Sequence, residues 1–148
     1  MPNWCENTLK VIGDEKDLKK FTKKIKPKNF LSSFIPIPKE LENTTSPRKG
    51  KKDLNLILKY KTDNWYDWCR INWGTKWDFE VEIDGDPEFN EIIISFDSAW
   101  SPPIEGLKNI SKMYPNIIFF INYDEPGMGF KGLARIQNGT EKNSCFNY

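Results

Sequence analysis

The stretch SPPIEGLKNISKMYPNIIFFINY, residues 101–123, contains a complete transition from helix to strand. Ser101 is a typical helix N-cap, and the two prolines after it suit a first helical turn, where their missing N–H groups need no partner. Pro115 and Asn116 end the helix, and the apolar run over 117–123 predicts a central strand buried on both faces. The apolar stripe of the helix consists of Ile104, Leu107, Ile110 and Tyr114.

A β-hairpin is predicted immediately before this stretch. Apolar residues at positions 79, 81 and 83 alternate with acidic ones, which is the period-two pattern of a strand with one exposed face. A turn over 85–87 leads into a second strand over 92–96. The candidate acidic face of the first strand consists of Asp78, Glu80, Glu82 and Asp84.

The first part of the chain predicts a strand over 8–12 and a helix capped by Asp14. Leu18, Phe21 and Ile25 recur at helical spacing, lysines occupy the solvent side, and Pro27 ends the helix. Residues 27–77 form a long insertion with a basic tip at 48–52. Its second half predicts a helix that begins near Asp63 and contains Trp65, Trp68, Cys69 and Trp73.

The predicted order of elements defines the fold class. After residue 123, a turn over 127–129 leads to a final strand over 130–136 and a polar tail that frays. The underlying order β-α-β-β-α-β is the ferredoxin-like split βαβ arrangement of α+β proteins, with helices on one face of a mainly antiparallel sheet. We therefore expect a single domain over 1–148, with an extra C-terminal strand and the 27–77 insertion carrying a Trp-rich helix.

Composition excludes several functions. The chain has 148 residues, a net charge of +1 and no histidine, which removes Ser-His-Asp and Cys-His nucleophiles and His-ligated zinc. Its three cysteines have no metal or redox spacing, so we expect reduced thiols, no metal and no cofactor. No secretory segment follows Met1, and no apolar run is long enough to span a membrane. These features favour a cytoplasmic protein without a membrane partner.

The near-zero net charge conceals an asymmetry. Residues 1–61 carry 15 basic and 7 acidic side chains, whereas residues 62–148 carry 7 basic and 14 acidic ones. The lysines of the first helix and of the 48–52 tip leave nucleic acid open as a partner, although no aromatic residues are interleaved with them. The carboxylates of the 78–84 strand either pair with Lys131 and Arg135 of the last strand or form an anionic surface that imitates a nucleic-acid backbone.

A second candidate site surrounds Lys76, which lies between two tryptophans. In one interpretation the segment forms a binding cleft, in which the lysine holds an anion and the indoles stack on a planar group. In the other it is a corner of the core. Glu125 and Asp124 are the carboxylates most suitable for acid-base chemistry in a chain without histidine. The candidate cleft consists of Trp73, Lys76, Trp77, Trp100, Tyr123 and Glu125.

Several signatures occur together in one order along the chain. They are PNWC at 2–5 followed by Asn7, WGTKWD at 73–78, AWSPP at 99–103, and the series Tyr123, Glu125, Gly127, Phe130 and Gly132. This combination resembles the YubB-type ferredoxin-like proteins of plasmids and bacteriophages. The resemblance implies a ferredoxin-like fold and an origin in a mobile genetic element, but no activity.

These observations favour binding over catalysis. We expect a non-enzymatic accessory protein of a phage or plasmid that acts by protein-protein contact with a host or element-encoded protein, for example by blocking a host defence or nucleic-acid-handling protein. A nucleic-acid-binding accessory protein is the alternative, and a carboxylate-dependent enzyme comes third. Fold by itself does not decide between them.

Overall fold

The computed structural model describes all 148 residues and contains a six-stranded antiparallel sheet in the order β2-β3-β1-β4-β5-β6. The strands are β1 (Trp4–Ile12), β2 (Glu82–Asp86), β3 (Glu91–Ala99), β4 (Ile118–Glu125), β5 (Phe130–Gln137) and β6 (Thr140–Asn147). The order of the first four is that of a ferredoxin-like split βαβ unit, which confirms the predicted fold class.

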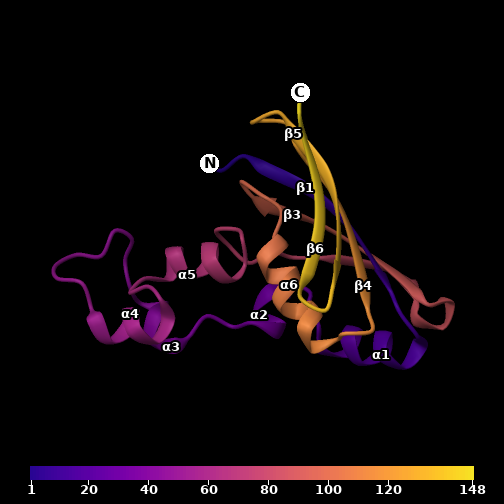
Figure 1. The fold of residues 1–148 in the computed structure, drawn as a ribbon, viewed down its shortest axis with the longest axis horizontal. Helices are drawn as coiled ribbons and strands as arrows, with labels where there is room; N and C mark the ends of the chain where they lie inside the picture. The colour runs from indigo at the N-terminus through magenta and orange to yellow at the C-terminus, as the bar shows by residue number, and fades with distance from the viewer.

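Helices cover only one face of this sheet, as Figure 1 shows. The helices are α1 (Glu15–Lys24), α2 (Phe30–Phe34), α3 (Lys39–Glu42), α4 (Leu54–Tyr60), α5 (Trp65–Asn72) and α6 (Ile104–Met113), and a 3-10 turn spans Pro87–Phe89. Phe21 of α1 and Leu107 of α6 are buried in the same cluster as Leu9 of β1. None of the helices is both long and apolar enough to cross a membrane.

Alternation along β1 separates the two faces. Cys5, Asn7, Leu9 and Val11 are buried toward the helices, whereas Glu6 and its alternate neighbours are exposed on the face that no helix covers. Because β1 pairs with β3 on one side and β4 on the other, this central strand sets the register of the whole open face.

The predicted insertion is more regular than a loop. It contains α2, α3, α4 and α5, and the last three form a lobe that projects beside the sheet (Figure 1). Helix α5 is the predicted Trp-rich helix, and Trp68 and Cys69 are buried in the core. Its N-cap is Asn64, whose side chain accepts the N–H of Asp67; Asp63 lies one residue before it.

Four sequence predictions about elements are wrong. The strand predicted over 78–84 begins at Glu82, because Asp78 is held elsewhere. Strand β4 is central but buried on one face only. Ser101 does not cap α6; its hydroxyl donates to the Gly74 carbonyl. The polar tail does not fray but forms β6, which is exposed on both faces and pairs with β5.

Candidate functional site

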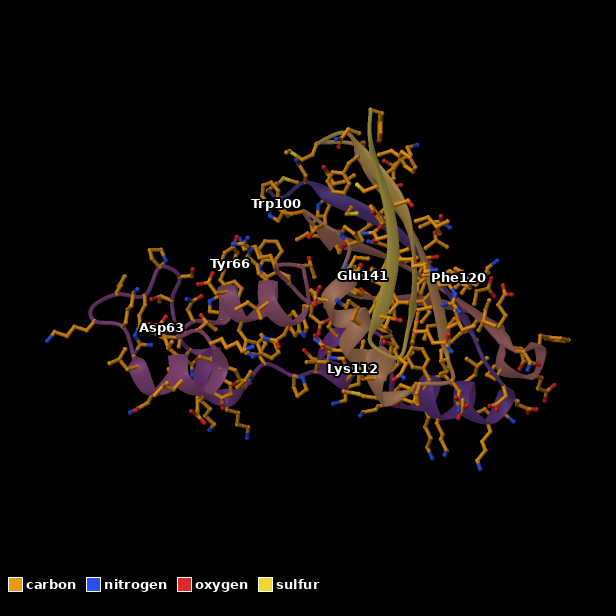
Figure 2. All side chains as sticks on the ribbon, viewed as in Figure 1. Asp63, Tyr66, Trp100, Lys112, Phe120 and Glu141 are labelled. Atoms are coloured by element: carbon orange, nitrogen blue, oxygen red, sulfur yellow. The ribbon has the colours of Figure 1, made fainter.

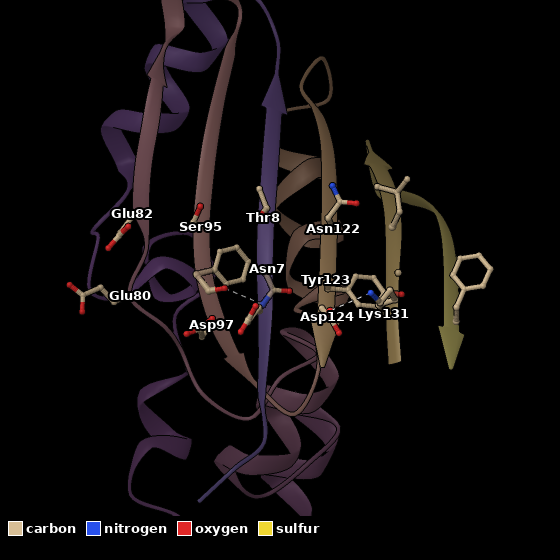
Figure 3. A pocket seen from close by; sticks show the side chains of 15 residues that line it. Asn7, Thr8, Glu80, Glu82, Ser95, Asp97, Asn122, Tyr123, Asp124 and Lys131 are labelled. Atoms are coloured by element: carbon tan, nitrogen blue, oxygen red, sulfur yellow. Dashed lines mark hydrogen bonds and ion pairs between the residues drawn. The ribbon is translucent and has the colours of Figure 1, made fainter. Parts of the chain in front are cut away.

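A groove of about 940 Å³ crosses the open face of the sheet and is shown in Figure 3. It lies at the end of β1 nearest the N-terminus. All six strands contribute to its walls, β2 through its first residue, Glu82. The charged side chains that line it are Glu6, Glu80, Glu82, Asp97, Asp124 and Lys131. Five carboxylates therefore face a single ammonium group.

Three of these carboxylates form a row across neighbouring strands. Glu6 lies directly opposite Asp97 of β3 and directly opposite Asp124 of β4 in the antiparallel register. Directly opposed side chains of neighbouring strands lie about 5 Å apart at Cβ, and like charges in such positions are destabilising. We call Asp97, Glu6 and Asp124 the acidic row.

Only one end of the acidic row is neutralised. Lys131 Nζ lies 3.6 Å from Asp124 Oδ2, and the Tyr148 hydroxyl donates to Asp124 Oδ1. This hydrogen bond is the main reason why the pKa of Tyr148 is raised to about 12. Glu6 and Asp97 have no cation within 4.0 Å.

The predicted acidic face is present in part. Glu80 and Glu82 line the groove, and Asp84 follows Glu82 on the same face of β2, where its carboxylate accepts the N–H of Gly85. Asp78 does not belong to this face. Its two carboxylate oxygens accept the N–H groups of Leu31 (2.7 Å) and Ser32 (2.8 Å) at the start of α2.

The predicted partners of the acids are wrong. Lys131 and Arg135 lie on β5, and three strands separate β5 from β2, so neither is positioned to pair with the acids of that strand. Glu6 and Asp97 were missed, and Asp124 was considered only for acid-base chemistry, because the sequence separates the three by 91 and 27 residues. In the sequence, each of them is only a charged residue at an exposed position of a strand. The pairing of β1 with β3 and β4 brings the three carboxylates together.

The candidate cleft around Lys76 divides into three environments. Trp73 is 1% exposed and its Nε1 donates to the Ile35 carbonyl, so it belongs to the core. Lys76 and Trp100 do share a smaller pocket, with Tyr66 and Arg70 of α5. The ring of Trp77 lies 4.5 Å from Lys76 Nζ.

Tyr123 and Glu125 lie apart from that pocket, in the β4-β5 hairpin. Glu125 is fully buried, and its carboxylate accepts the N–H groups of Gly127 and Met128. The Tyr123 hydroxyl donates to Asn143 Oδ1 at 2.7 Å, and burial raises its pKa to about 12. The Tyr123 hydroxyl is thus engaged by β6, and the Glu125 carboxylate by the turn that follows β4.

Comparison with known proteins agrees with this fold. Residues 60–147 match the family model described as the ferredoxin-like domain in Api92-like protein. The chain belongs to this Api92-like family. The match includes five of the six strands and leaves out β1, which lies between β3 and β4 in the sheet of this chain.

A solved relative supports the family at the level of the fold. The crystal structure of a protein Api92 from Yersinia pseudotuberculosis aligns with a TM-score of 0.64 and 12% identity, covering 100% of this chain and 98% of that chain. No curated protein matches significantly. The Api92-like assignment thus confirms a ferredoxin-like family and carries no activity with it.

The hairpin residues that carried the resemblance have structural roles in this Api92-like chain. Gly132 lies opposite Tyr123, and a Cβ at this glycine would collide with the Tyr123 hydroxyl and the Ser144 carbonyl. A Cβ at Gly127 would lie 2.8 Å from Glu125 Oε1. These glycines therefore allow a tyrosine and a carboxylate to pack against the backbone.

Proposed function

We propose that this chain is a non-enzymatic binding protein whose open-face groove receives a basic segment of a protein partner. The observation that carries the proposal is the acidic row, in which Glu6 faces two other carboxylates without a cation beside it. Such a row costs stability in the free protein, and a cationic partner would remove that cost. Glu80 and Glu82 extend the same negative potential toward β2.

The shape of the groove suits an extended segment. The acidic row runs perpendicular to the strands, with a spacing of about 4.8 Å between neighbouring backbones. At its far end the groove offers Leu133 and Phe146, which are 48% and 64% exposed, for apolar contact. Lysine or arginine side chains can thus meet the carboxylates while a neighbouring apolar side chain packs on Phe146.

We also propose that the partner handles nucleic acid. A protein that binds phosphates has a basic surface, and the closely spaced carboxylates of the groove present it with a comparable negative charge. The sequence resemblance to plasmid and bacteriophage proteins supports an accessory role in a mobile element, directed at a host defence or nucleic-acid-handling protein.

The two alternative functions have less support. Five carboxylates in the groove repel a polyphosphate, so direct nucleic-acid binding would have to use a surface outside the groove, such as the exposed lysines of α1 or the 48–52 tip. Glu125, the predicted acid-base residue, is fully buried and held by two backbone N–H groups, so catalysis would have to use the exposed carboxylates of the groove instead.

The proposal is tested with an extended peptide of alternating lysine and threonine. We expect it to shift NMR signals of β1, β3 and β4 in the full chain, with an affinity that falls as salt is added. The Glu6→Gln/Asp97→Asn variant should bind about tenfold more weakly, whereas Glu42→Gln, which changes an unpaired exposed acid on α3, should not change the affinity.

Two results would refute the proposal. One is the absence of shifts in the groove at low salt. The other is an equal affinity of the double variant and the Glu42→Gln control.

A further inference from the structure

A second pocket, of about 470 Å³, lies between α5 and the turn that follows β3. It is separate from the groove, and no acidic residue lines it. Its lining includes Tyr66 and Arg70 of α5, Lys76 from the segment after that helix, and Trp100 at the end of β3. Figure 2 labels Tyr66 and Trp100 on the same side of the molecule.

Both cations of the pocket are free of carboxylate partners. Neither Arg70 nor Lys76 has an acidic oxygen within 4.0 Å. Arg70 Cζ lies 5.7 Å and Lys76 Nζ 5.8 Å from the same Tyr66 ring, and both side chains line the same pocket. The guanidinium group suits a bidentate contact with phosphate, and the ammonium group adds a point charge.

Trp100 supplies a planar surface beside these charges. Its side chain is 47% exposed, and its backbone adopts φ 72°, a left-handed conformation that is unusual for a bulky residue. Such strain persists only where surrounding contacts enforce it, and strained residues cluster at binding sites. An exposed indole in a fixed position offers a stacking partner for a flat ring.

Hydrogen bonds fix the Trp100 turn against the segment that contains Lys76. The Thr75 hydroxyl donates to the Ala99 carbonyl at 2.8 Å, and the Ser101 hydroxyl donates to the Gly74 carbonyl at 2.7 Å. The Trp100 N–H donates to the Asn3 carbonyl at 2.9 Å. The aromatic surface and the cationic end of the pocket are therefore held in a constant relation, which lowers the entropic cost of binding.

We infer that this pocket binds a nucleoside monophosphate, with the phosphate at Arg70 and Lys76 and the base stacked on Trp100. The ligand needs both parts, because the pocket pairs two unpartnered cations with an exposed aromatic face. Its volume lies within the range of small-molecule sites. The same chemical group is present in a free mononucleotide and at the phosphorylated end of a nucleic-acid strand.

Calorimetric titration of the full chain with AMP tests the inference. We expect saturable binding, and binding about tenfold weaker for both adenosine and inorganic phosphate, since each lacks half of the recognised group. Arg70→Gln and Lys76→Gln should each weaken AMP binding by about tenfold, the usual effect of one charge-assisted hydrogen bond. Trp100→Ala should weaken AMP and leave inorganic phosphate unchanged.

The control is Lys20→Gln, which removes an exposed lysine of α1 without an ion-pair partner. It should bind AMP like the parent chain. A short 5′-phosphorylated oligonucleotide distinguishes the two sources: tighter binding than AMP assigns the site to strand ends, and binding equal to or weaker than AMP assigns it to free nucleotides. The inference is overturned if AMP does not bind saturably, or if Arg70→Gln and Lys76→Gln bind it like Lys20→Gln.

Discussion

The two faces of the sheet at β1 differ in how their polar side chains are paired. On the covered face, Asn7 Nδ2 donates to the Cys5 carbonyl at 2.8 Å and to Ser98 Oγ at 2.9 Å. Glu125 is held by two backbone N–H groups. On the open face, Glu6, one residue away from both Cys5 and Asn7, faces Asp97 and Asp124.

This contrast separates structural polar groups from candidate binding groups. A buried polar group must be paired, because burial without a partner costs about 1–3 kcal/mol, so its pairing says nothing about function. Solvent-facing carboxylates have no such requirement, and three of them in a row act against the fold. The acidic row is therefore not explained by the packing of the sheet, which is why we proposed a partner for it.

The largest expected difference between buried and exposed positions is in the reactivity of the cysteine thiols. Burial is the main reason why the pKa of Cys5 rises from 9.0 to about 12, and the pKa of Cys69 rises equally for the same reason. Their thiolate fractions at pH 8 are thus about a thousandfold lower than that of an ordinary thiol. With Cys145 exposed, a thiol reagent should label one cysteine of the native protein quickly and the other two only after denaturation. Fast labelling of a second cysteine would contradict the described burial of the covered face.

The same shifts give the stability a pH dependence. The folded thiols keep their protons up to about pH 12, whereas unfolded thiols ionise near 9.0. Their contribution to stability is therefore complete below pH 9 and is lost as the pH rises from 9 toward 12. Urea unfolding at increasing pH should show this decline. A Cys5→Ala/Cys69→Ala variant serves as the control, because it should lose stability at neutral pH but show a shallower alkaline decline.

The second effect concerns the carboxylate of the covered face. Glu125→Gln keeps the size of the side chain but replaces one of the two accepting oxygens by an NH2 group, so either the Gly127 or the Met128 N–H loses its acceptor. We expect a loss of about 2 kcal/mol, or about thirtyfold in the folding equilibrium. The midpoint of urea unfolding measures it. A change below about 0.5 kcal/mol would mean that the buried carboxylate is not needed by the hairpin.

The smallest expected effect is a gain in stability, from a Glu→Gln substitution on the open face. Glu6→Gln removes the central charge of the acidic row, so we expect a gain of about 0.5 kcal/mol. Added salt should reduce the gain, since it screens the repulsion in the parent chain. Glu42→Gln, an unpaired acid on α3, should change stability little under the same conditions. Destabilisation by Glu6→Gln would show that the row supports the fold.

Local patterns predicted much of the fold. Asp14 caps α1 as expected and accepts the N–H of Asp17 at 2.9 Å, and the hairpin strand predicted over 92–96 lies within β3. Elements that depend on contacts between residues far apart in the sequence were not predicted correctly. Asp78 left the predicted strand because its carboxylate caps α2, 46 and 47 residues earlier. Strand β6 lies at the edge of the sheet with both faces exposed, so its sequence has no apolar alternation to detect.

The candidate sites show the same limit. Glu80 and Glu82 were found from their alternation, and Lys76 and Trp100 from their unusual neighbours. The rest of the groove was not predictable, because Glu6, Asp97 and Asp124 meet only through pairing of three strands. Arg70 was not predicted, because it joins this pocket only through the folding that brings α5 beside Trp100.

The central position of β1 has a consequence for synthesis on the ribosome. Its hydrogen-bonding partners are β3, where Trp4 pairs with Ala99, and β4, where Glu6 pairs with Asp124. Because β1 is translated before β3 and β4, neither of its edges is covered until these later strands have emerged. Such distant pairing slows folding, and the open edges of the waiting strand make the nascent chain dependent on protection from aggregation.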